Sequence, residues 1–121
     1  MSECSVTMQT KKGVHIVQVK GSLDAATFPG VEQQLRELLD RENACVVMDC
    51  KHLTYLYSGA IGALIRFART AQEQDGCLKL VHLSPRIRKI FEVMGFNRVL
   101  EVNQDLEGAL RELGRQVEKR R

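Results

Sequence analysis

Long apolar stretches are absent from this 121-residue sequence. No apolar run approaches the roughly 20 residues that a membrane-spanning helix needs, and residues 1–10 lack the apolar centre of a signal peptide. We therefore expect a cytoplasmic protein with no membrane partner. The length suits a single domain, which we place at 1–121, with its core at about 6–113 and a basic tail at 118–121.

The sequence also lacks the spacings of common metal, phosphate and nucleic-acid sites. Its four cysteines form no C-x-x-C pair, the spacing typical of zinc and thioredoxin-like sites. No stretch has the glycines followed by lysine of a phosphate-binding P-loop. The formal net charge is only +3, and the basic residues do not gather into the stripe that nucleic-acid binding needs. We expect reduced cysteines, no metal or cofactor, and no nucleic-acid partner.

What the sequence does contain is an alternation of strand and helix patterns. Short apolar runs and alternating segments predict strands, and apolar residues at helical spacing predict helices. The predicted strands span 5–10, 14–20, 44–49, 77–83 and 99–102. The predicted helices span 24–41, 58–74 and 85–94, with a fourth that begins at Asn103 or Asp105.

The order of these elements predicts an α/β fold. Strands that alternate with helices pair in parallel through right-handed crossovers, and the opening pair forms an antiparallel hairpin. We predict a small mixed β-sheet, with an antiparallel hairpin and then parallel strands, covered by about four amphipathic helices. The helix at 85–94 is expected to bury Ile87, Ile90, Phe91 and Met94.

The segment after the third predicted strand is the best candidate for a site. In open α/β sheets, ligands and partners gather at the loops after the carboxyl ends of strands. Here a loop at 50–57 leads into the helix that begins at Ser58, which we place at the N-cap. As a cap, Ser58 would stabilise the helix by about 1 kcal/mol. As a phosphorylation site, it would present its phosphate to free N–H groups at the positive end of the helix dipole.

Other residues near this segment allow more than one interpretation. Cys50 and His52 would lie on one side of an extended segment beside Asp49, which suggests a Cys–His nucleophile. The sequence supplies no orienting group and oxyanion donors together, so we do not predict an enzyme. Gly59 and Gly62 permit close approach of another backbone, and close helix packing within the fold would explain them equally well.

Four short motifs follow one another at characteristic positions. Gly21-Ser22-Leu23-Asp24 follows the second strand, and Asp49 ends the third. The stretch Leu56-Tyr57-Ser58-Gly59-Ala60-Ile61-Gly62 opens the second helix, and Gly95-Phe96 precedes the last strand. Together, from about Val6 to Leu113, they resemble the STAS domain family, in particular its anti-sigma-factor antagonists (anti-anti-sigma factors).

The resemblance implies a regulatory protein-binding module without catalytic residues of its own. It implies partner switching, in which the domain binds an anti-sigma factor serine kinase until that kinase phosphorylates Ser58 using ATP and magnesium. A serine phosphatase would reverse the modification. The expected partner-binding surface comprises Asp24, Tyr55, Tyr57, Ser58, Gly59, Ala60, Ile61 and Gly62. We expect a monomer or a weak homodimer.

Two residues depart from the family pattern. Tyr57 stands where the family has aspartate, and Ala60 stands where it has glycine. Alanine suits a helix interior. The loss of aspartate beside Ser58, however, leaves a second possibility, a phosphorylation-independent STAS scaffold or sensor subunit in a bacterial signalling complex. Tyr57 itself is either an interface anchor or a half-buried loop aromatic.

Overall fold

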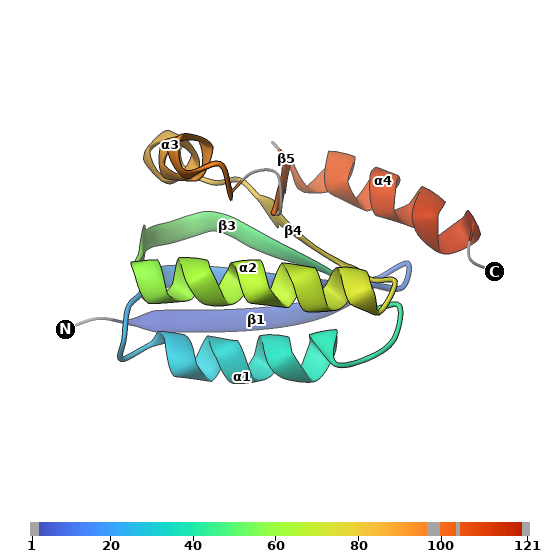
Figure 1. The fold of residues 1–121 in the computed structure, drawn as a ribbon, viewed down its shortest axis with the longest axis horizontal. Helices are drawn as coiled ribbons and strands as arrows, with labels where there is room; N and C mark the ends of the chain where they lie inside the picture. The colour runs from blue at the N-terminus through green and yellow to red at the C-terminus, as the bar shows by residue number, and fades with distance from the viewer. Residues whose placement is uncertain (1–2, 97–99, 104, 120–121) are drawn as a thin grey trace.

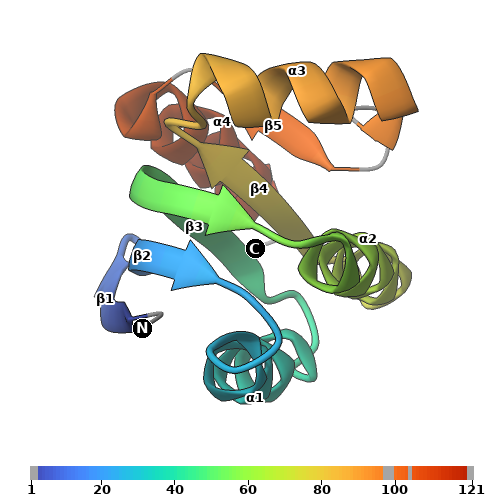
Figure 2. The ribbon, with the colours of Figure 1, turned by 90° about the vertical axis from the view of Figure 1, so that its left-hand side faces the viewer.

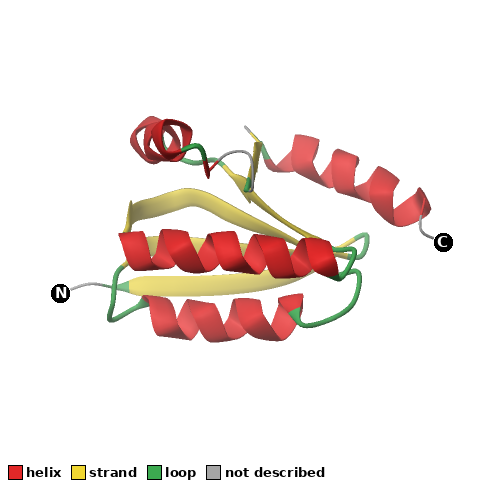
Figure 3. Cartoon of the chain, viewed as in Figure 1, coloured by secondary structure: helices red, strands yellow, loops and turns green. Residues whose placement is uncertain are grey.

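The structure, a computed structural model, describes residues 3–96, 100–103 and 105–119, with side chains at 3–96, 100 and 105–113. Strands and helices alternate after an opening hairpin, as Figures 1 and 3 show. The strands are β1 (Cys4–Lys11), β2 (Val14–Leu23), β3 (Cys45–Leu56), β4 (Cys77–Val81) and β5 (Glu101–Asn103). The helices are α1 (Phe28–Leu39), α2 (Ser58–Glu73), α3 (Pro85–Met94) and α4 (Leu106–Lys119).

One sheet contains all of these strands, in the order β1-β2-β3-β4-β5. β1 and β2 are antiparallel, and the turn between them has positive φ at Lys12 (52°) and Gly13 (79°). Such turns match the twist of a hairpin. The remaining neighbours are parallel, as expected for strands joined through helices. The predicted mixed sheet is confirmed.

The helices cover the two faces of the sheet unequally. α1 and α2 lie on one face and α4 lies on the other (Figure 2). The larger hydrophobic core lies beneath α1 and α2 and also receives Ile87 and Phe91 from α3. The smaller one lies beneath α4 and consists of Val14, Cys45, Val47, Val81, Ala109 and Leu113.

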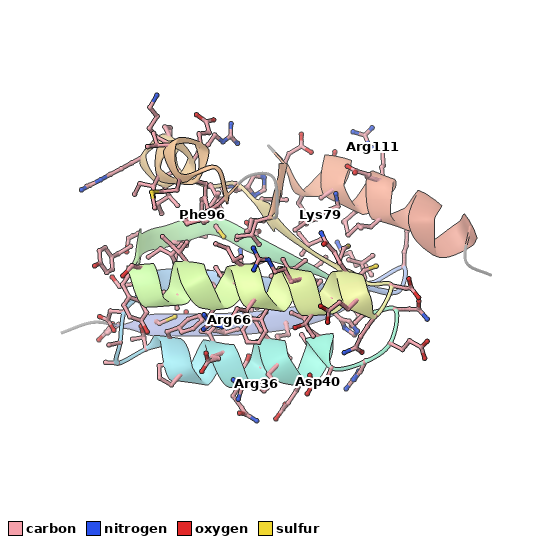
Figure 4. The ribbon with its side chains drawn as sticks, viewed as in Figure 1. Arg36, Asp40, Arg66, Lys79, Phe96 and Arg111 are labelled. Atoms are coloured by element: carbon pink, nitrogen blue, oxygen red, sulfur yellow. The ribbon has the colours of Figure 1, made fainter. Side chains whose placement is uncertain are left out.

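An ion pair between a buried lysine and a half-exposed glutamate joins α4 to its face of the sheet. Lys79 of β4 is only 1% exposed, and its Nζ lies 3.0 Å from Oε1 of Glu112. Figure 4 shows Lys79 beneath α4. A buried charge that loses its partner is strongly destabilising, so this pair favours the docked position of α4.

β3 is twice as long as the strand predicted at 44–49, and the loop predicted at 50–57 is wrong. Register shifts along the β2–β3 pair allow β3 to stay beside β2 as far as Leu56. Bulges of this kind insert an extra residue and turn the following side chains. The apolar run ends at Cys50 because, among the later residues of β3, only Leu53 and Leu56 are buried.

Several other predicted boundaries also need correction. The first long helix begins at Phe28 and not at Asp24. β4 ends at Val81 because His82 takes a positive φ of 59°, which a strand does not permit. β5 spans 101–103 in place of 99–102, and position 99 lies outside the described residues. α4 begins after Asp105, whose Oδ1 accepts a hydrogen bond from the Gly108 N–H (2.6 Å).

α3 buries less than its pattern predicted. Ile87 and Phe91 are buried, whereas Ile90 and Met94 are 42% and 59% exposed. Residues four apart share one face of a helix, and α3 meets the core only along the stripe of Ile87 and Phe91. Ile90 and Met94, also four apart, share a neighbouring face that remains exposed within the described part of the chain.

Candidate functional site

The candidate site lies where β2 and β3 end side by side. Leu23 pairs with Leu56 at the ends of these parallel strands. The Tyr57 N–H then donates to the Leu23 carbonyl over 3.0 Å. This pairing places the turn at 21–27 next to the start of α2, at the edge of the sheet where α/β folds usually bind partners.

Asp24 organises the turn that precedes α1. Its Oδ1 accepts hydrogen bonds from the backbone N–H groups of Ala26 (2.9 Å) and Thr27 (3.0 Å). The Thr27 hydroxyl in turn lies 2.6 Å from the Ser22 carbonyl, to which it donates. Carboxylates commonly stabilise turns in this way. Asp24 therefore has a structural role at the position where the sequence predicted partner binding.

Ser58 is the first residue of α2 and not its N-cap. The N-cap is Tyr57, whose extended backbone (φ −82°, ψ 162°) directs its carbonyl to the N–H groups of Ala60 and Ile61. No side chain in the described part of the chain caps α2. Ser58 is exposed. Its hydroxyl is thus free of the capping role that the sequence suggested.

The positive end of the α2 dipole has no acidic residue within its own first turn. The aspartate that the family pattern places before Ser58 is replaced by Tyr57. Anionic groups are stabilised at such helix ends. The start of α2 is therefore chemically suited to an added negative group.

Tyr57 is a half-buried aromatic that covers the beginning of α2. Its ring packs edge-on against Phe28 of α1, with centroids 6.2 Å apart. A Cβ atom at Gly59 would lie 2.6 Å from the Tyr57 ring, which is too close for van der Waals contact. A side chain at 59 would therefore require the Tyr57 ring to move. At Gly62, by contrast, a Cβ atom would approach only Arg66, at 3.5 Å, so close packing does not require that glycine.

The predicted partner-binding residues divide into two groups. Tyr55 (52% exposed), Ser58 and Gly59 face solvent, with Asp24 and Tyr57 partly exposed beside them. Ala60 and Ile61, at 0% and 8% exposed, point into the core, and Gly62 is half-buried. A docking surface here must therefore exclude the side chains of Ala60 and Ile61.

Two hydroxyl-bearing residues of this region were not among the predicted partner-binding residues. Ser22 and Thr54 lie on neighbouring strands with their hydroxyl oxygens 3.3 Å apart. Thr54 was assigned to a loop because the apolar run ends before it. Buried Leu53 and Leu56 are three residues apart, which is not the period-2 alternation of a regular strand, so no local pattern revealed the longer strand.

Cys50 and His52 do not share one side of β3. Cys50 is 1% exposed, whereas His52 faces solvent. The two side chains differ because the pairing of β3 with β2 shifts register between Asp49 and His52. Burial, with the negative charge of Asp49, raises the pKa of the Cys50 thiol well above its usual range. A neutral buried thiol is a poor nucleophile.

Asp49 is partnered by a different histidine. Its Oδ1 lies 2.9 Å from Nδ1 of His82 and accepts a hydrogen bond from the Lys51 N–H over 3.1 Å. The Asp49 carboxylate thus links the middle of β3 to the residue that follows β4. In the described ranges, no group of three or more potential ligands could hold a metal ion.

Comparison with known proteins identifies the family. The STAS domain profile matches residues 5–109. The anti-sigma-B factor antagonist of Listeria monocytogenes is 25% identical over 107 residues, which cover 88% of this chain and 93% of that protein. Among the helices at 3–96 and 105–119, none is long and apolar enough to cross a membrane.

Solved structures show the same fold. An anti-sigma factor antagonist from Mycobacterium paratuberculosis superposes with a TM-score of 0.81 at 21% identity, covering 92% of this chain and 94% of that one. The phosphorylated form of the Bacillus cell fate determinant SpoIIAA superposes with a TM-score of 0.69 at 16% identity, covering 88% and 98%. Because the profile match spans most of the sequence, this chain belongs to the STAS domain family.

Proposed function

We propose that this protein is an anti-sigma factor antagonist that binds a kinase-type anti-sigma factor and is released when Ser58 is phosphorylated. The observation that carries the proposal is the exposed Ser58 at the start of α2, where the N-cap Tyr57 makes no side-chain cap hydrogen bond. Two similar proteins support the same role: the Listeria anti-sigma-B factor antagonist and Bacillus SpoIIAA, whose structure is known in a phosphorylated form. The docking surface comprises Asp24, Tyr55, Tyr57, Ser58 and Gly59.

Phosphorylation would act on the surface and leave the fold intact. A phosphoserine carries roughly two negative charges. At the first turn of α2 these charges would be stabilised by the free N–H groups and the helix dipole. For a partner docked over Ser58, the same charges would be desolvated without a matching cation, which is costly.

In this role the protein is a substrate and not an enzyme. The anti-sigma factor supplies ATP, magnesium and the transfer chemistry, and a serine phosphatase restores the unmodified hydroxyl. The buried Cys50 thiol, with its raised pKa, supports the assignment of Cys50 to the core. Rapid selective alkylation of Cys50 in the folded protein at neutral pH would contradict this part of the proposal.

The proposal is tested by measuring affinity for a kinase-type anti-sigma factor of the native organism by calorimetry. Ser58→Asp should lower affinity by about 2 kcal/mol or more, roughly thirtyfold, because an unpaired charge is buried at the interface. Ser58→Ala should bind like the wild type. Ser84→Asp is the matched control, since it adds the same charge at the start of α3 while aspartate keeps the cap.

Two results would overturn the switch. If Ser58→Asp and Ser84→Asp changed affinity equally little, the protein would instead be a phosphorylation-independent STAS scaffold or sensor subunit. If no anti-sigma factor bound the unmodified protein, the antagonist role itself would fail. Circular dichroism of each variant would show that the fold is retained.

A further inference from the structure

β1 is an edge strand without the usual protection against pairing. Within the described residues its outer side pairs with no other strand. Proteins normally guard such edges with charges, proline, bulges or very short strands. The opposite edge, β5, is only 3 residues long. β1 is 8 residues long, and positions 4–10 contain neither a charged residue nor proline.

The backbone of β1 offers a regular set of free hydrogen-bonding groups. The Glu3 carbonyl accepts from the Ser22 N–H of β2 over 3.0 Å, so Glu3 directs its backbone groups inward. The direction alternates along an antiparallel strand. Cys4, Val6, Met8 and Thr10 therefore direct their N–H and C=O groups outward.

The side chains on the α1 side of this edge are apolar or uncharged. Met8 is 53% exposed although it stands on the same face as Val6, which packs against the core. Beside this edge lies a shallow hollow lined by Cys4, Val6, Thr27, Gly30, Val31 and Gln34. An added strand would cover Met8 and the open side of this hollow, and it would meet no charged lining residue.

We propose that two copies of this chain pair through β1 to form a continuous antiparallel sheet. In the proposed register, Thr7 lies opposite Thr7 of the second copy. Val6 then faces Met8 of the second copy, and Glu3 faces its Lys11. These pairs occur twice by symmetry, as in any two-fold interface. Opposite charges at the ends and apolar pairs inside are both favourable across strands.

The sequence around β1 is self-complementary, which favours a second copy of this chain as the partner that pairs with β1. The two charged positions, Glu3 and Lys11, lie at equal distances from Thr7 along the chain, so that one register neutralises both. Shifting the register by two residues would leave these charges unpaired. This inference does not depend on the proposed function, because it uses neither Ser58 nor its neighbours.

Cysteine cross-linking tests the register. Thr7 directs its backbone groups toward β2, so Thr7 and its copy would form a non-hydrogen-bonded pair with Cα atoms about 4.5 Å apart, which is within disulfide range. In a Cys4→Ser background, Thr7→Cys should form a covalent dimer under mild oxidation. Ser5→Cys alone should not, because its copy would lie about 13 Å away along the strand.

Mixing two variants that each carry one introduced cysteine provides the matched control. In the proposed register Ser5 faces Gln9 of the second copy, so Ser5→Cys mixed with Gln9→Cys should give a cross-linked dimer. Neither variant should do so alone. Equal cross-linking of Ser5→Cys alone and Thr7→Cys would indicate random collision and overturn the proposal.

A proline variant tests the interface without cross-linking. Met8→Pro removes an outward N–H that β2 does not use, a change that edge strands tolerate. Sedimentation at increasing protein concentration should show the wild type reaching twice the single-chain mass. The folded Met8→Pro protein should remain a single chain. Adding Met8→Pro to the Thr7→Cys variant should abolish its cross-linking. A wild type that stays a single chain throughout, without cross-linking of Thr7→Cys, would contradict the inference.

Discussion

The starts of α2 and α3 each present a serine, and the two serines have different roles. Ser84 is the N-cap of α3, and its Oγ accepts a hydrogen bond from the Ile87 N–H over 3.3 Å. Ser58 lies one residue further into its helix, after the N-cap Tyr57. A serine side chain therefore caps α3, whereas the serine at the start of α2 does not cap its helix.

The difference shows that position relative to the cap decides what a serine can do. The hydroxyl of an N-cap serine is committed to the helix. A serine at the first helical position points its hydroxyl to solvent, near N–H groups that attract anions. This distinction separates a structural serine from a candidate for modification more clearly than the sequence pattern does.

The largest stability effect is expected at the turn beside the α2 start. Asp24→Ala removes the oxygen that accepts from two backbone N–H groups, and we expect a loss of about 2 kcal/mol in the free energy of unfolding. Urea denaturation measures it. Asp24→Asn keeps an acceptor oxygen and should cost clearly less. If the alanine variant were as stable as the wild type, this turn would not support the site.

Removing the cap of α3 should have the next largest effect. Ser84→Ala leaves the Ile87 N–H without its partner and should cost about 1 kcal/mol. Ser84→Asp should retain most of the stability because aspartate is an equally good cap. Thermal unfolding of the three proteins gives the ranking. Equal losses for Ser84→Ala and Ser84→Asp would mean that the cap is not the cause.

The contact of Tyr57 with Gly59 predicts a coupling between two substitutions. Gly59→Ala should gain helix propensity in a Tyr57→Ala protein, but not in the wild type, where the ring occupies the Cβ position. We expect a coupling free energy of about 0.5–1 kcal/mol in a double-mutant cycle. Additive effects would show that the ring moves away without cost.

The smallest effect is expected for Ser58 itself. Because its hydroxyl does not cap α2, Ser58→Ala should change the free energy of unfolding by less than about 0.5 kcal/mol. Measured beside Ser84→Ala in the same denaturant series, this result would complete the comparison. A loss as large as that of Ser84→Ala would return Ser58 to a structural role.

Sequence patterns predicted the fold well where burial is one-sided and regular. The hairpin and the order of the elements follow from apolar periodicity. The extension of β3 did not, because its second half depends on register shifts against β2 that no local pattern encodes. The exposure of Ile90 and Met94 likewise depends on how little of the sheet α3 covers.

The candidate site was predicted less completely than the fold. The motifs located Ser58 and Asp24 correctly at one edge of the sheet, since both follow parallel strands. They could not show that Tyr57 is the cap, because that depends on its backbone angles and on the Leu23 carbonyl. Nor could they show the Asp49–His82 link, which joins residues 33 apart in the sequence.

Phosphate transfer is the most direct test of the central claim. The protein is incubated with a kinase-type anti-sigma factor of the native organism and MgATP, and modified peptides are identified by mass spectrometry. We predict phosphate on Ser58, complete loss of labelling in Ser58→Ala, and unchanged labelling in Ser84→Ala. Equal labelling of Ser58→Ala, or phosphate on Ser84, would contradict the proposed switch.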